Sequence, residues 1–268
     1  MKTILFLTEV LAGTHVAKLE GVYELARQYG WHVVDAEFEN SRHSIADYIH
    51  TWHPDGCIVV GSALTAPLSP RSLSGLPTVY LDPDERTRRA GKAYVASDPR
   101  PLAELAAREL MAHECASYAY VGWSERTAWS EDRRRAFADI IRGAGLPFAA
   151  FAGHFSPKDK ISFQRQLRAW LKRLPKPCGV FTANDTTAAQ VIDACQSLGL
   201  DIPTDVAVVG VDNQEIVCEN APVSLTSIEI DFRAAGRLGA EALAEFLVDP
   251  SRAPAPRLFG PRRIVRRQ

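Results

Sequence analysis

Several polar side chains that could hold a ligand stand at or next to the ends of short apolar runs. Four of them are Asp82, Asn184, Asp185 and Asp212. A carboxylate can accept two hydrogen bonds from neighbouring hydroxyl groups, and an amide can both donate and accept. These residue types therefore suit the recognition of a polyhydroxylated molecule. The segment Asp82-Pro83-Asp84 also has the residue types of a turn, so that interpretation of Asp82 stays open.

The pair Asn184 and Asp185 also opens a segment of helical period. One of the two side chains is therefore expected to cap the helix N-terminus. Capping needs only one side chain, which leaves the other for a ligand. Asp212 is placed in the same way after its own apolar run, although it could instead cap a following helix or turn.

Arg133 is the cationic candidate. It lies four residues before Phe137 and shares its apolar stripe, so it is expected to point inward from the first turn of a helix. The helix dipole disfavours a cation at that end. The guanidinium therefore needs a partner, either a ligand oxygen or an acid such as Asp212 or Asp82. The alternative is a solvated arginine within the basic run 133–135.

Two tryptophans, Trp123 and Trp129, flank a short loop after the apolar run 118–121. An indole face beside polar groups suits the apolar face of a sugar ring, so Trp129 is included among the candidate ligand-binding residues. The alternative is that both tryptophans only pack locally.

Signatures of catalysis are absent from the sequence. It contains no G-x-S-x-G, H-E-x-x-H, P-loop or G-x-G-x-x-G pattern, and no histidine stands with a plausible nucleophile. Arginine, asparagine and aspartate without a nucleophile favour binding without chemistry. We therefore expect a protein that is not an enzyme and that needs no metal or cofactor.

The elements that must position these side chains alternate between short apolar runs and segments of helical period. This alternation predicts parallel sheets built from strand–helix–strand units. Several runs are apolar throughout, as expected of strands covered on both faces. In open parallel sheets ligands bind beyond the carboxyl ends of the strands, where the candidates stand. The runs are 4–7, 33–34, 57–60, 78–81, 118–121, 179–181 and 206–211.

The chain contains more strand–helix units than one open sheet needs. We therefore predict an α/β protein with two doubly wound parallel-sheet lobes, joined by a short hinge of several crossing segments. The N-lobe is expected to hold residues 1–97 and 228–248, and the C-lobe residues 98–227. Residues 249–268 are expected to form a terminal strand or linker.

Composition limits the classes of partner. The 268 residues are 46% hydrophobic and 24% charged, and the net charge of −1 gives no general attraction to nucleic acid. No apolar stretch approaches the roughly 20 residues of a membrane span, and the first apolar run is too short for a signal peptide. Five cysteines without a C-x-x-C pattern favour a reducing, cytoplasmic compartment.

The second half of the sequence closely resembles the effector-binding domains of the lac-repressor family. The stretches that carry this resemblance are 180–185, Ala188, 199–213, 225–228 and the helical segment 231–243. Within that family the whole chain looks most like the bacterial xylose operon regulators. The features are Trp52 with Asp55-Gly56, 129–137, 169–171 with Leu174-Pro175, 212–215 and 263–267.

This resemblance implies a type I periplasmic-binding-protein-like fold, whose lobes close on a small effector that is usually a sugar. It implies that Arg133, Asn184 and Asp212 hold sugar hydroxyls and that Asp82 is a contact from the first lobe. Ile230 departs from the pattern, because relatives often carry a polar residue there, so one hydrogen bond to xylose would be lost. A homodimer is also implied.

The resemblance also indicates where a DNA-binding domain would lie relative to this one. Lac-type repressors carry their DNA-binding helices before this domain, and the xylose regulators carry theirs after it. We therefore predict the sugar-binding effector domain of a bacterial transcription regulator, which contacts DNA only through a domain absent from this chain. A periplasmic sugar-binding protein of a transporter is the alternative with the same fold, and a small enzyme on a doubly wound scaffold is a third hypothesis.

Overall fold

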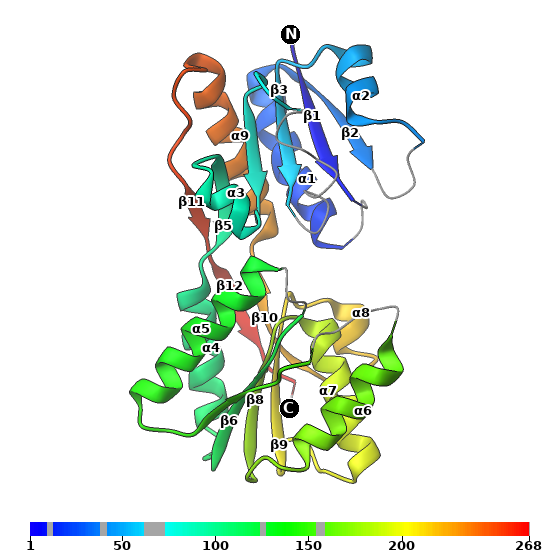
Figure 1. Cartoon of the computed structure of the whole chain (residues 1–268), viewed down its shortest axis with the longest axis vertical. Helices are drawn as coiled ribbons and strands as arrows, with labels where there is room; N and C mark the ends of the chain where they lie inside the picture. The colour runs from blue at the N-terminus through cyan, green and yellow to red at the C-terminus, as the bar shows by residue number, and fades with distance from the viewer. Residues whose placement is uncertain (10–12, 38–41, 62–72, 124–126, 154–158, 268) are drawn as a thin grey trace. The chain divides into compact units, whose positions relative to one another are not determined.

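The computed structural model describes residues 1–9, 13–37, 42–61, 73–123, 127–153 and 159–267, and the chain divides into two compact units (Figure 1). Unit 1 holds Met1–Ser97 and Asp231–Phe259. Unit 2 holds Asp98–Ile230 and Gly260–Gln268. Each unit is built on its own sheet with helices packed against it, so the predicted architecture of two mostly parallel α/β sheets is confirmed.

Unit 1 contains a six-stranded sheet in the order β11-β5-β4-β3-β1-β2, within the described ranges. Its neighbouring strands are all parallel. Helices α1 and α9 pack on each other, and α9 also lies against β3, β4 and β5. The strands are β1 (Lys2–Thr8), β2 (Trp31–Glu37), β3 (Gly56–Val60), β4 (Thr78–Leu81), β5 (Ala93–Ser97) and β11 (Arg257–Phe259), and the helices are α1 (Thr14–Tyr29), α2 (Ile45–Trp52), α3 (Glu85–Arg89) and α9 (Phe232–Val248).

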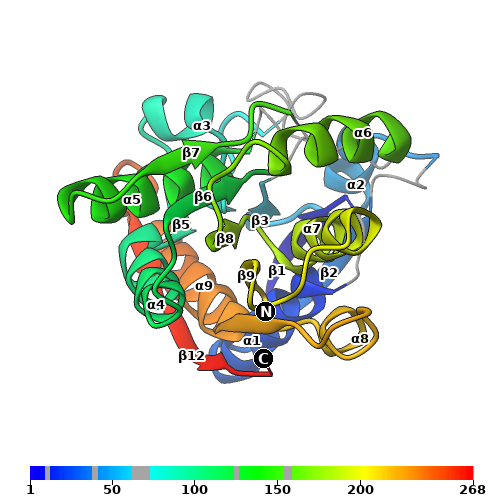
Figure 2. The same cartoon turned by 90° about the horizontal axis from the view of Figure 1, so that it is seen from below.

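Unit 2 contains a second six-stranded sheet in the order β12-β10-β9-β8-β6-β7, in which only the β10–β12 pair is antiparallel. Helices α4 and α5 lie on one side of β6 and β8, and α6 and α7 lie on the other (Figure 2). The strands are β6 (Ser117–Val121), β7 (Phe148–Ala150), β8 (Cys178–Thr182), β9 (Val206–Val211), β10 (Thr226–Ile230) and β12 (Pro261–Val265), and the helices are α4 (Pro99–Met111), α5 (Ala128–Gly143), α6 (Lys160–Leu171), α7 (Asp185–Leu198) and α8 (Glu215–Cys218).

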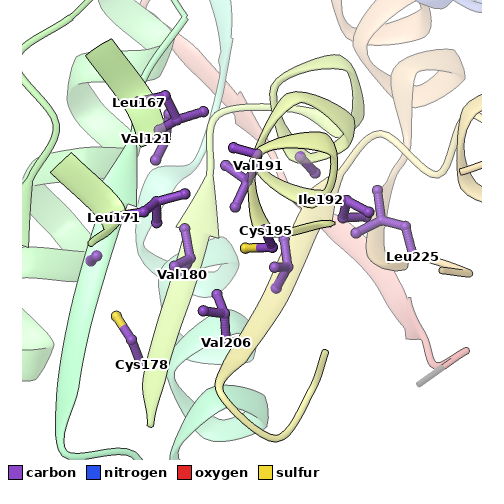
Figure 3. Close-up of a cluster of buried hydrophobic side chains, with 14 of the residues drawn as sticks. Val121, Leu167, Leu171, Cys178, Val180, Val191, Ile192, Cys195, Val206 and Leu225 are labelled. Atoms are coloured by element: carbon purple, nitrogen blue, oxygen red, sulfur yellow. The ribbon is translucent and has the colours of Figure 1, made fainter. Parts of the chain in front are cut away.

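The central strands of both sheets are buried along their whole length, which explains why their sequences are apolar without alternation. In unit 2, one face of the sheet packs on α6 and α7 (Figure 3). Valines of three neighbouring strands meet leucines of α6 and aliphatic residues of α7 there. The labelled residues include Val121, Val180, Val206, Leu167, Leu171, Val191 and Ile192.

The division of the chain differs in part from the boundaries expected from the sequence. The change of unit after Ser97 falls at the expected position, whereas residues 228–230 belong to unit 2. The segment 249–268 is shared between the units, because its two short strands pair with different sheets. Strand β11 joins β5 in unit 1, and β12 joins β10 in unit 2.

Among the described residues, no helix is both long enough and apolar enough to cross a membrane. All five cysteines are buried and unpaired. Burial raises the pKa of the Cys115 thiol to about 11 and that of Cys195 to about 12, so these thiols stay protonated at neutral pH.

Candidate functional site

Three of the predicted ligand-binding residues stand at the carboxyl ends of neighbouring strands in unit 2. Strands β6, β8 and β9 are adjacent and parallel, so their carboxyl ends lie at the same edge of the sheet (Figure 1). Arg133 comes from α5, which follows β6, while Asn184 follows β8 and Asp212 follows β9. We call this edge, with these three residues, the carboxyl edge of unit 2.

Arg133 is buried, as its periodicity predicted, with a relative exposure of 3%. The expected place in the first turn was wrong, because α5 begins at Ala128 and Arg133 is its sixth residue. Its Nη1 donates a hydrogen bond to the carbonyl oxygen of Ala183, which connects the first part of α5 to the end of β8. Among the residues that the structure describes, its Nε is buried without a hydrogen-bond partner. A buried, unsatisfied donor is costly, and a nearby ligand oxygen would remove that cost.

The first turn of α5 is fixed by a buried hydroxyl from the sheet. Tyr120 donates a hydrogen bond of 2.8 Å to the carbonyl oxygen of Ser130, and Ser130 Oγ accepts one of 3.1 Å from the backbone N–H of Trp123. Burial raises the pKa of Tyr120, so the phenol remains a donor at neutral pH. Sequence reasoning did not identify Tyr120 as a support. Residues 124–126, which follow Trp123 in the sequence, lie outside the described residues.

Trp129 lies in the same turn of α5 as Ser130 and is partly buried. The guanidinium carbon of Arg133 stands over its indole ring, 4.7 Å from the ring centroid. One face of the indole therefore contacts a protein cation, in a geometry that is attractive electrostatically.

Asn184 is the residue that caps α7. Its Oδ1 accepts hydrogen bonds from the backbone N–H of Thr187 at 3.0 Å and from Thr187 Oγ1 at 2.9 Å. These contacts use only the oxygen of the side-chain amide. The amide nitrogen takes no part in the cap, and the residue is half-buried, so a donor remains at the carboxyl edge.

Asp185 differs from the expectation that the residue beside the cap would face a ligand. Its side chain is fully buried. It accepts hydrogen bonds of 2.5 Å from Ser227 Oγ and of 2.7 Å from the backbone N–H of Gln214. Both oxygens thus hold β10 and the start of α8 to α7. The sequence could not reveal this role, because both partners are far away along the chain.

Burial raises the pKa of the Asp185 carboxyl to about 6, while the bonds from Ser227 and Gln214 act in the opposite direction. An unfolded aspartate titrates near 4. The folded state therefore binds more protons than the unfolded state between about pH 4 and pH 6. The contribution of Asp185 to stability is complete below this window and decreases as the pH rises through it.

We therefore expect the wild type to lose about 2–3 kcal/mol of unfolding free energy relative to Asp185→Asn between pH 4 and pH 7. Urea unfolding of both proteins across this range measures the difference, and the comparison cancels the titration of all other groups. A difference that stays constant with pH would contradict the raised pKa.

Asp212 follows β9 in an unusual backbone conformation. Its φ is 104°, and that of Asn213 is 51°. Its backbone N–H donates to the carbonyl oxygen of Ile228 at 2.9 Å, which ties this turn to β10. Positive φ values at residues without glycine's freedom are strained and often occur at functional sites. The turn presents the half-buried Asp212 at the carboxyl edge.

Asn213 was not among the sequence-predicted site residues. Its Oδ1 accepts a 3.0 Å hydrogen bond from Arg267 Nη2, and its backbone N–H donates to Ser227 Oγ at 3.1 Å. The sequence signal that could have identified it is asparagine itself, which tolerates the left-handed conformation better than most residues.

Asp82 belongs to unit 1 and is engaged inside it. Its Oδ2 accepts a 2.7 Å bond from Lys18 Nζ of α1, and its Oδ1 accepts a 3.3 Å bond from the backbone N–H of Ser97. Its own N–H donates to the carbonyl oxygen of Val95, and its φ is 50°. The turn interpretation fits this backbone. The buried cation Lys18 was not foreseen.

The carboxyl edge of unit 2 offers guanidinium and amide donors from Arg133 and Asn184, together with the carboxylate of Asp212. This combination can exchange hydrogen bonds with hydroxyl groups, which both donate and accept. Among the described residues, no group of three or more His, Cys, Asp or Glu side chains could hold a metal ion.

Comparison with known proteins gives the family. A family model described as a periplasmic binding protein-like domain matches residues 107–268, which is more than half of the chain. The xylose operon regulatory protein of Haemophilus influenzae is 29% identical over 171 residues, or 63% of this chain and 44% of the relative. The chain thus spans about half the length of the curated relatives that it matches first.

Solved structures agree on the fold. A complex of the transcriptional regulator CelR with cellobiose has a TM-score of 0.81 at 21% identity, covering 100% of this chain and 84% of CelR. The xylose-binding transcription activator XylR also has a TM-score of 0.81, at 23% identity, covering 99% of this chain and 68% of XylR.

The chain belongs to the periplasmic binding protein-like domain family. The resemblance to xylose operon regulators that the sequence indicated is confirmed by the Haemophilus influenzae relative. The chain also shares the fold of a LacI family transcriptional regulator from Mycobacterium smegmatis, with a TM-score of 0.79 at 17% identity over 99% of this chain and 98% of that one.

Proposed function

We propose that the carboxyl edge of unit 2 binds a monosaccharide, and that this chain is the effector-binding part of a transcription regulator. The observation that carries the proposal is the buried Nε of Arg133, which lacks a hydrogen-bond partner among the described residues at the edge where parallel sheets bind ligands. A sugar hydroxyl accepts a hydrogen bond from such a donor. Asn184 and Asp212, on the two neighbouring strand ends, would take further hydroxyl groups.

The names of the relatives support this function. The Haemophilus influenzae relative is a xylose operon regulatory protein, and the two solved structures are regulators described with cellobiose or as xylose-binding. Ile230 is the last residue of β10, the strand that pairs in parallel with β9, and it is apolar and buried. It offers no hydrogen bond, so we do not restrict the proposed ligand to xylose.

Regulation is the second part of the proposal. A sugar that binds one arrangement of the two units better than another shifts the equilibrium toward that arrangement. We propose that this shift is passed to a DNA-binding part outside the chain, in a cytoplasmic homodimer that is not an enzyme. The units defined above, rather than the boundaries expected from the sequence, would be the bodies that move.

The experiment is a calorimetric titration of the protein with a panel of pentoses, hexoses and cellobiose. We expect saturable binding of at least one pentose or hexose, and at least a tenfold loss of affinity in Arg133→Met, because hydrogen bonds from charged groups contribute about 1.5–3 kcal/mol. Arg134→Met is the matched control, since Arg134 is partly exposed and paired with Glu131 on the same helix.

Absence of saturable binding across the panel would refute the proposal. Equal affinities of wild type and Arg133→Met would show that the ligand binds somewhere other than the carboxyl edge. Chemical conversion of a bound sugar would support the enzyme hypothesis instead. A transporter-associated binding protein would bind sugars equally well, so DNA binding by the complete protein, changed by the sugar, is the measurement that separates the two.

A further inference from the structure

Trp129 and Arg133 form a pair one helical turn apart at the start of α5. The guanidinium carbon lies 4.7 Å from the centroid of the indole ring, within the range of a cation–π contact. Residues four positions apart on a helix lie on the same face, so the contact follows directly from their spacing. One face of the indole, a ring that the sequence suggested for a sugar, therefore contacts the arginine.

The position of Arg133 makes such a contact valuable. Its side chain is almost completely buried, where an uncompensated charge is costly. Arg133 is the sixth residue of α5 and lies beyond the first turn, where the helix dipole acts, so burial is the main cost. The electron-rich indole face and the carbonyl oxygen of Ala183 both stabilise the guanidinium at this place.

These two contacts hold the guanidinium at two points. The indole ring of Trp129 lies against its central carbon, and the bond from Nη1 to Ala183 holds one of its terminal nitrogens. The Nε–H of the same group is buried and has no partner among the described residues. A planar guanidinium recognises oxygens through such fixed N–H directions.

We propose that Trp129 is a positioning residue, which holds the Arg133 guanidinium in place for ligand oxygens instead of stacking on the sugar ring. This inference rests on the proposed function. On this proposal, Arg133 contacts the ligand and Trp129 orients Arg133. Trp129 should therefore affect ligand binding only when Arg133 is present.

A ligand-free measurement tests the positioning. The Nε–H of Arg133, identified by its absence from the ¹⁵N NMR spectrum of Arg133→Met, should be shifted upfield by the indole ring and should exchange slowly with water. Trp129→Leu should abolish the upfield shift and accelerate exchange, while Trp129→Phe, which keeps an aromatic face, should retain much of both. An Nε–H signal that is the same in wild type and Trp129→Leu would overturn the proposal.

A double-mutant cycle tests the link to binding, with whichever sugar of the panel binds the wild type. Trp129→Leu should weaken binding about tenfold, in line with a desolvated cation–π contact. In the Arg133→Met background the same substitution should have no further effect, because the interaction that it removes is already absent. An equal loss in both backgrounds would indicate a direct contact with the sugar and overturn the proposal.

Trp170→Leu is the control for the loss of a tryptophan. Trp170 is a partly buried residue of α6 that packs on Phe151, away from α5, and its replacement should leave affinity unchanged. Thermal unfolding of each variant separates loss of affinity from loss of fold. If no sugar binds the wild type, the proposed function fails, whereas the NMR comparison still decides whether Trp129 positions Arg133.

Discussion

Replacing Lys18 by methionine should lower the free energy of unfolding by about 3–5 kcal/mol, the typical cost of breaking a buried ion pair by removing one partner. The Lys18 and Asp82 side chains are only 4% and 10% exposed, and their charged atoms are 2.7 Å apart. Methionine fills much of the same volume, so the effect reports the Asp82 charge left without its cation. Urea unfolding of the variant and the wild type measures it.

Two further variants make this prediction specific. Replacing both partners by Lys18→Met and Asp82→Leu should recover part of the lost stability, since an apolar pair of similar volume often tolerates burial well. Arg100→Met removes a cation from the Arg100–Glu104 pair, whose side chains are 63% and 53% exposed, and should cost less than about 1 kcal/mol. A loss in Lys18→Met as small as that of Arg100→Met would contradict the importance of burial.

The surroundings of this pair suggest why a charge is retained in the interior of unit 1. Lys18 Nζ stands over the Phe232 ring, 5.1 Å from its centroid, and Asp82 accepts the backbone N–H of Ser97. Ser97 and Phe232 lie at or beside positions where the chain changes unit. Through these contacts the ion pair links Ser97 and Phe232, which stand where the chain leaves and re-enters unit 1, to α1 and β4.

The fold was predictable because its information is local. Fully buried parallel strands need continuous apolar residues, and the helices between them need apolar stripes, so runs such as 57–60 and 206–211 predict their strands directly. The structure of the segment 249–268 was harder to predict from the sequence. Strands β11 and β12 are short, and Phe259 is their one buried residue, so their pairing with two different sheets leaves no clear pattern in the sequence.

The candidate site was predictable only as far as position relative to the strands determines it. Arg133, Asn184 and Asp212 stand at one sheet edge because parallel strands bring their carboxyl ends together. The partners of Asp82 and Asp185 could not be foreseen, because Lys18 and Ser227 are distant along the chain. Which carboxylate is partly exposed and which is fully buried depends on tertiary packing, and a single sequence carries little information about it.

The crossing of α1 and α9 supports the second large prediction. A β-carbon added at Gly236 would lie 1.9 Å from the carbonyl oxygen of Lys18, and one added at Gly21 would lie 2.0 Å from that of Arg233. The two helices thus approach through their backbones at both glycines. Neither carbonyl oxygen can rotate away as a side chain could, so any larger residue must push the helices apart.

Gly236→Ala should therefore destabilise unit 1 by about 3 kcal/mol, at the upper end of overpacking effects, even though alanine is the better helix former. Gly143→Ala is the matched control, because Gly143 is a helical residue with no atom within 4 Å of an added β-carbon. The control should be neutral or up to about 1 kcal/mol more stable. Chemical denaturation measures both, and equal behaviour of the two variants would show that α1 and α9 can separate freely.

Since Gly236 contacts the backbone of Lys18 itself, its replacement should also disturb the ion pair, and the losses of unfolding free energy in Gly236→Ala and Lys18→Met should not add.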